Sequence, residues 1–193
     1  MIGASLQYLA MQLNLHLRRT MAVREDLVVV SRILENDGKE YEGAVNKLNL
    51  FLVNLERDSM VQNRVTTPEV HGDRAVVPPK MVYLNLYFVI AANFKGGNYV
   101  DSLRYLSKAV AFFQDHAFFE RTSWPDMPEG LEKLFIDMEC LSMQELNNLW
   151  GTIGAKYVPS VVYRLRTVAL GGNYSYYQPY VIRFPENSEL GLI

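Results

Sequence analysis

The side chains that most often do chemistry are few in this sequence, and their spacing does not form a catalytic site. Asp137 and Glu139 stand two residues apart, so in a strand they share one face, as a pair of carboxylates for acid–base catalysis would. No histidine or further acid is suitably placed beside them, and a solvated polar face explains them better. Ser160 follows a proline but lacks the G-x-S-x-G sequence that places a nucleophilic serine in a sharp turn. We therefore expect no catalytic residue and a protein that is not an enzyme.

Metal and cofactor sites are equally unsupported. The three histidines, His16, His71 and His116, are far apart in the sequence and form no i, i+3 or i, i+4 ligand pair. Cys140 has no second cysteine to pair with, which suits a reducing compartment. Gly-Gly-Asn-Tyr occurs at 96–99 and 171–174, but it lacks the spacing of nucleotide-binding loops and indicates two turns. We expect no metal and no cofactor.

Composition and charge narrow the possible partners. The 193 residues are 49% hydrophobic and 21% charged, which is typical of one globular domain with its own core. A net charge of −2 argues against general binding to nucleic acid or anionic membranes. Tyr163, Arg164 and Arg166 combine aromatic and basic groups, but strand alternation places the tyrosine and the arginines on opposite faces.

Nothing in the sequence predicts export or membrane insertion. The N-terminus has no basic start followed by an apolar stretch and a small-residue cleavage site. The most apolar window, 81–92, is shorter than the roughly 20 residues that a bilayer-spanning helix requires, and it contains Asn85. We expect the protein to fold and assemble in the cytoplasm.

Hydrophobic periodicity predicts an α+β domain that contains a mainly antiparallel sheet of about five strands flanked by helices. The predicted helices cover residues 2–19, about 99–113 and 143–150, and the predicted strands cover 27–30, 46–57, 80–94, 131–141 and 160–169. Strand 46–57 is apolar on both faces, so we expect both faces to be covered. The polar connection 58–79 is long enough to suggest a functional or mobile loop.

Several side-chain orientations follow from the same patterns. The helix near residue 100 should bury Val100, Leu103, Leu106, Val110 and Phe113, which fall on one stripe. Strand 131–141 should point Leu134, Ile136, Met138 and Cys140 inward. Ser142 and Glu145 form a capping box at the start of the last helix, and Gly151 and Gly154 should end that helix.

The chain divides into a domain over 1–171, beginning with a helix over 1–20, and an aromatic arm over 172–193. The arm contains Tyr174, Tyr176, Tyr177, Tyr180 and Phe184. So many aromatic side chains should not remain in water, so the arm either folds back on its own sheet or docks on another chain, for example as an added strand. Helix 2–19 is a second candidate interface, represented by Leu9 and Leu13, because its apolar face is broad.

Three sequence blocks, taken in order, resemble a known family. They are LNLFLVNLERD at 48–58, PKMVYLNLYFVIAA at 79–92, and a block at 141–166 in which a capped helix ending in Leu-Trp precedes Tyr-x-Pro-Ser-x-x-Tyr. Together they resemble the tube-terminator, or cap, proteins of contractile injection systems. These are phage-tail-like particles of the anti-feeding-prophage and virulence-cassette type, with related contact-dependent, type VI secretion-like machines. The residues that carry the third block are Trp150, Tyr157, Pro159, Ser160 and Tyr163.

The resemblance, which covers roughly residues 5–170, implies a structural role. Members of this family are thought to form a six-fold ring on the distal end of the inner tube and sheath, where the ring stops polymerisation and fixes length. The implied partners are other copies of the chain and the tube and sheath subunits. Two alternatives stay open: a baseplate or assembly adaptor of the same particle, and a small enzyme with an unrecognised site.

Overall fold

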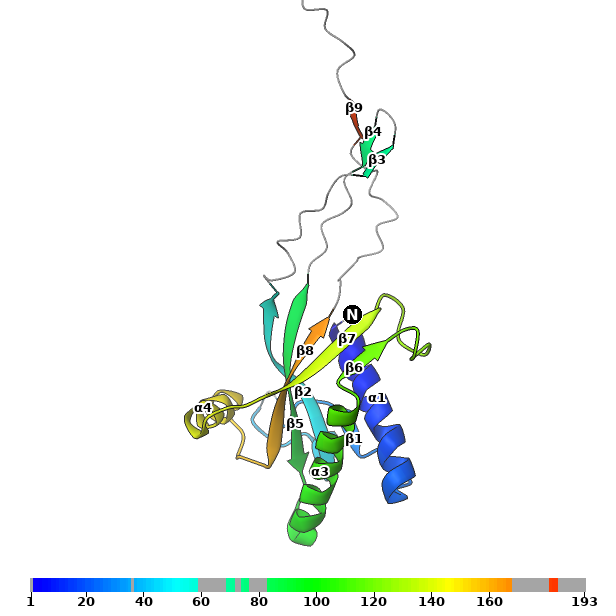
Figure 1. The fold of residues 1–193 in the computed structure, drawn as a ribbon. Helices are drawn as coiled ribbons and strands as arrows, with labels where there is room; N and C mark the ends of the chain where they lie inside the picture. The colour runs from blue at the N-terminus through cyan, green and yellow to red at the C-terminus, as the bar shows by residue number, and fades with distance from the viewer. Residues whose placement is uncertain are drawn as a thin grey trace, which may run out of the picture.

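The computed structural model describes residues 2–35, 37–58, 69–71, 74–76, 83–167 and 181–183, and it describes only the backbone of 69–71, 74–76, 167 and 181–183. The described part of the chain contains a six-stranded sheet, a three-stranded sheet and three α-helices (Figure 1). The predicted α+β class is therefore confirmed.

The larger sheet has the strand order β1-β2-β5-β8-β7-β6. Its strands are β1 (Val28–Val30), β2 (Lys47–Arg57), β5 (Leu84–Asn93), β6 (Phe118–Glu120), β7 (Lys133–Glu139) and β8 (Ser160–Thr167). Only β1 and β2 run parallel in this sheet, and the other neighbouring strands are antiparallel. The expected number of about five strands is one too few, because β6 has only three residues and shows no alternation that could reveal it.

A second, three-stranded sheet has the order β3-β4-β9. Here β3 (Glu69–His71) and β4 (Arg74–Val76) come from the predicted long connection, and β9 (Val181–Arg183) comes from the predicted arm. All pairs are antiparallel, with Val181 opposite Val76 and Arg183 opposite Arg74. Two segments that the sequence analysis treated separately are therefore joined by backbone pairing.

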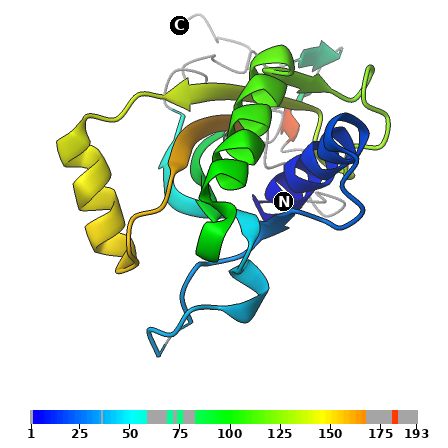
Figure 2. The same ribbon diagram turned by 90° about the horizontal axis from the view of Figure 1, so that it is seen from below.

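Two layers of helix cover opposite faces of the larger sheet. Helices α1 (Ile2–Met21) and α3 (Tyr99–Asp115) pack on one face, and α4 (Met143–Ile153) packs on the other (Figure 2). The α1–α3 side holds the main core, in which the ring of Phe88 lies 5.5 Å from Tyr163 and 6.4 Å from Phe113. The α4 side holds a smaller cluster around Trp150 and Val89.

The predicted stripe of α3 is partly wrong. Val100 is 68% exposed and Leu103 is exposed as well, whereas Ala109 and Phe112 are buried beside Leu106 and Phe113. The buried face is rotated because α3 contacts both the sheet and α1, so residues between these two surfaces become enclosed.

The ends of two strands also differ from expectation. In β2, Leu48 and Leu50 are fully buried, but Leu52 and Leu55, on either side of a register shift between Leu52 and Asn54, are exposed. The prediction that both faces are covered therefore applies only to the first half of this strand. Met138 in β7 and Cys140, one residue after this strand, are exposed rather than inward-facing.

Helix α4 begins as predicted and ends later than predicted. The side chain of Ser142 accepts a hydrogen bond from the Glu145 N–H, and the Glu145 carboxylate accepts one from the Ser142 N–H, which confirms the capping box. The helix continues through Gly151 to Ile153. It ends at Gly154, whose φ of 75° suits glycine because the residue has no Cβ.

Candidate interaction surfaces

The carboxylates considered for catalysis are engaged in ion pairs across the sheet. Asp137 lies 3.0 Å from the Arg166 guanidinium and 3.6 Å from that of Arg164, and Glu139 lies 3.0 Å from Arg164. Arg166 also lies over the Phe135 ring, 5.6 Å from its centroid. Tyr163 lies on the opposite face, as predicted, and is buried in the main core. The two arginines therefore neutralise the two acids instead of forming a free basic surface.

Two of the histidines meet in the fold although they are distant in the sequence. The ring of Phe112 lies 5.0 Å from His16 and 4.7 Å from His116, so the two imidazoles contact the same phenylalanine. Burial is the largest cause of the lowered pKa of His16, and the positive charge of His116 contributes. No group of three or more potential metal ligands occurs among the described residues. The side chain of His71 lies outside them.

The family-motif residues join α4 to the sheet. The Trp150 indole N–H donates to the Ser160 hydroxyl over 3.3 Å, and the Trp150 and Tyr157 rings lie 5.7 Å apart. The carbonyl of Pro159 accepts a hydrogen bond from the Ala92 N–H, which holds the start of β8 against β5. Tyr163 stacks on Phe88 on the other face, where burial raises the pKa of its hydroxyl to about 12. These contacts fix α4 and the start of β8 against the sheet.

The predicted interface residues fall into two groups. Leu9 and Leu13 are fully buried in the main core, so neither offers surface to a partner while the fold is intact. The aromatic residues Tyr174, Tyr176, Tyr177, Tyr180 and Phe184 lie outside the described residues.

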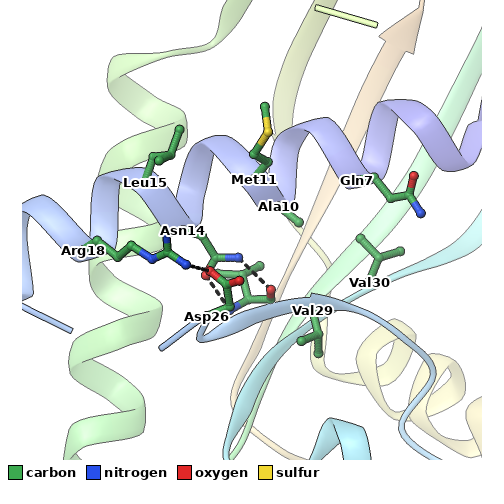
Figure 3. A pocket seen from close by; sticks show the side chains of 10 residues that line it. Gln7, Ala10, Met11, Asn14, Leu15, Arg18, Asp26, Val29 and Val30 are labelled. Carbon is green, nitrogen blue, oxygen red and sulfur yellow. Dashed lines mark hydrogen bonds and ion pairs between the residues drawn. The ribbon is translucent and has the colours of Figure 1, made fainter. Parts of the chain in front are cut away.

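The exposed side of α1 borders a hollow that the sequence analysis did not identify. The hollow lies between α1 and β1 and has a volume of about 390 Å³ (Figure 3). Its apolar rim includes Met11, Leu15 and Val30, which are 43%, 36% and 38% exposed. The sequence signal for this surface is that Met11 and Leu15 widen the apolar face of the helix. The hollow itself could not be predicted, because the position of β1 beside these residues depends on tertiary packing.

The polar groups of this hollow are largely paired. Asn14 donates from its side-chain amide to the Val28 carbonyl over 2.8 Å and accepts from the Val28 N–H over 2.9 Å. Arg18 and Asp26 form an ion pair of 2.6 Å at one end (Figure 3). The hollow is therefore of mixed character, with six apolar and four polar residues in its lining.

A smaller hollow lies between β2 and α4. It has a volume of about 220 Å³, and its lining includes Ile33, Phe51, Leu149 and Ile153. Both hollows are open and lie near the β1 edge of the larger sheet.

None of the helices in the described ranges combines the length and the apolar character needed to cross a membrane.

Solved structures with a similar fold define the class to which this architecture belongs. The chain is similar to the tube-terminating cap of the anti-feeding prophage, with a TM-score of 0.53, 14% identity, and coverage of 92% of this chain and 57% of the other. The sheath/tube terminator of the extracellular contractile injection system PVC, in its extended state, gives a TM-score of 0.46 and 15% identity, covering 65% of this chain and 44% of the other. The fold is thus similar to that of the tube-terminating cap. The chain spans about half the length of these two proteins.

The family assignment is more specific. Residues 6–183 match the model of the Pvc16 N-terminal domain, and the chain belongs to this family. The resemblance to tube-terminator proteins drawn from the three sequence blocks is confirmed. No curated protein matches the sequence.

Proposed function

We propose that this protein is a structural terminator subunit of a contractile injection system. In this proposal, copies of the chain form a six-membered ring on the distal end of the inner tube and sheath, and the ring stops polymerisation and fixes length. The single observation that carries the proposal is the family match over residues 6–183. The shared fold with a tube-terminating cap supports it.

The physical requirements of a cap agree with this reading. Head-to-tail contacts between identical subunits give a ring when the rotation closes, and a filament when it does not. A cap also needs one face for the last tube or sheath ring and a second face that recruits nothing. We propose the inner tube and the sheath as partners, and assembly in the cytoplasm as part of a phage-tail-like particle.

Loss of the gene distinguishes the cap from its main alternative. Cells that produce the particle without this protein should yield over-long or unstable sheaths, measured as a length distribution by electron microscopy. Complementation with the intact gene should restore a narrow distribution. Absence of particles would instead indicate a baseplate or assembly adaptor, and unchanged lengths would exclude both roles.

We propose that the arm 172–193 makes contacts between subunits. Deleting it should prevent ring assembly and sheath attachment, measured by native mass spectrometry and by labelling of purified particles. The deletion also removes β9, which pairs with β4. A matched variant that changes Tyr174, Tyr176, Tyr177 and Tyr180 to Ser keeps 181–183 and should show the same loss. Normal assembly of both variants would disprove a role for the arm.

A further inference from the structure

We propose that the β3–β4 hairpin holds the C-terminal strand β9, and that the three strands act as one element in the contact between subunits. The proposal rests on the function proposed above and deepens it, because it adds the hairpin to the part of the chain that makes this contact. It also makes β9 the last strand of the domain.

The small sheet repeats the order of three neighbouring strands of the larger sheet. In the larger sheet β2, β5 and β8 lie side by side, and in the small sheet β3, β4 and β9 do. β3 follows β2 along the chain, β4 precedes β5, and β9 follows β8. Every pair among these strands is antiparallel in both sheets. The same three chain segments are therefore neighbours twice, in the same order, as expected for pairing within one chain.

The three segments leave the larger sheet at one level. Leu84 pairs with Arg57 on one side and with Thr167 on the other. Pairing continues one step beyond β2 and β5, since the Asp58 N–H donates to the Tyr83 carbonyl over 2.9 Å. The ends of β2, β5 and β8 therefore form a common base for the small sheet (Figure 1).

The shortest connection limits how far the small sheet can lie from this base. Val76, the last residue of β4, precedes Leu84 by eight residues. A fully extended chain spans at most about 3.3–3.6 Å per residue, so this connection covers no more than roughly 29 Å. Val181 follows Thr167 by fourteen residues, so the same chain can span this distance with residues to spare. Pairing of β9 with β4 therefore requires no second copy.

The family match ends where β9 ends. Residues 6–183 match the Pvc16 N-terminal domain, and β9 covers Val181–Arg183. The match thus includes both the hairpin and β9, which supports a domain that ends with this strand.

Strands this short depend on one another. Each strand of the small sheet has three residues, and a two-stranded hairpin alone is marginally stable in water. β9 adds a second ladder to β4. Removing the hairpin should therefore release β9, and removing β9 should weaken the hairpin, so the two changes should have the same effect on assembly.

Disulfide trapping in the isolated chain tests the pairing. Ala75 and Ile182 are partners in the register of β4 and β9. Cα atoms of such partners lie about 4.5–5.5 Å apart, a separation that a disulfide can bridge. A chain with Ala75→Cys, Ile182→Cys and Cys140→Ser should form an intrachain disulfide on mild oxidation, detected by faster migration on a non-reducing gel. The control places the second cysteine at Ser175, which precedes β9 in the same arm.

The Ile182 pair should close several-fold faster than the Ser175 pair. An unpaired arm would close both at similar rates, because the entropy of loop closure changes little with length. Equal rates, or a covalent dimer in place of the intrachain disulfide, would overturn the proposal. Because the chain is isolated, this result is independent of the particle-length experiment.

Assembly of three variants tests the shared role. One replaces 69–76 with a Gly-Ser linker of equal length, one lacks 172–193, and one combines both changes. Each should reduce ring assembly and incorporation into particles several-fold, and the combined variant should lose no more than either alone. Normal assembly of the linker variant, unequal losses in the two single variants, or a larger loss in the combined variant would overturn the shared role. Thermal unfolding verifies that each variant is folded, and Ala75→Pro, which removes a backbone donor from the central strand, replaces the linker if that variant is unfolded.

Discussion

The side-chain amide of Asn14 forms two hydrogen bonds with the backbone N–H and C=O of Val28. In a sheet, these two backbone groups would bond to a residue of a neighbouring strand. Asn14 and Val28 are both buried, so without the amide the N–H and C=O of Val28 would have no partner at this place in the sheet. Unpaired strand edges invite further strands, and a side chain that occupies part of the edge limits where another segment can add. Asn14 therefore hinders the addition of a further strand at Val28.

Replacing Asn14 with Leu should destabilise the protein by about 1–3 kcal/mol, because two buried backbone groups lose their partner. The free energy of unfolding from urea titration measures this change. Gln7→Leu, on the exposed part of the same helix, is the matched control and should change stability little. Equal effects of the two substitutions would show that the Asn14–Val28 bonds contribute nothing specific.

His16 should make the fold sensitive to mild acid. Its pKa in the folded state is below the ordinary value of 6.5, chiefly because of burial, so folding favours the neutral imidazole. The unfolded chain then binds more protons as pH falls below 6.5. The stabilising contribution is complete above 6.5 and is lost as pH falls through the folded pKa.

The free energy of unfolding measured between pH 7.5 and about pH 5 checks this expectation. It should fall with acidification, and His16→Gln should flatten the part of the curve just below 6.5. An unchanged slope in the variant would show that His16 does not cause the dependence.

At the scale of elements, α1 has two faces with different roles. Leu13 is fully buried against the sheet, while Leu15, two residues later, is exposed at the rim of the hollow. Leu13→Ala should cost about 2–5 kcal/mol of stability because it leaves a cavity in the core. Leu15→Ala should cost less than about 0.5 kcal/mol. Similar losses in chemical denaturation would contradict this assignment of faces.

The strongly periodic elements could be predicted from the sequence, as could the β-branched run of β1, but the other three-residue strands could not. Helix α1 and strands β2, β5, β7 and β8 follow from repeated apolar residues. Strands β3, β4, β6 and β9 have three residues each, and such segments owe their conformation to the strand beside them. The buried face of α3 also depended on a contact with α1 that no local pattern encodes.

The candidate site was only partly predictable for the same reason. The broad apolar face of α1 is visible in Met11 and Leu15, whereas the predicted interface residues of this helix, Leu9 and Leu13, lie in the core. A helical pattern cannot tell which part of a wide apolar face the sheet will cover. The meeting of His16 and His116 at Phe112 likewise requires the packing of α1 on α3.

At the scale of the molecule, the order of strands has a consequence for synthesis. β8 lies between β5 and β7, yet it follows every other strand of the larger sheet in the sequence. Until residue 167 has left the ribosome, the sheet consists of two separate parts, β1-β2-β5 and β6-β7, each with an unpaired edge and an incomplete core. Such intermediates are slow to form long-range contacts and prone to aggregation. A nascent chain therefore lacks the finished surface next to β8 until residue 167 has emerged, which delays any contact through that surface until the larger sheet can close.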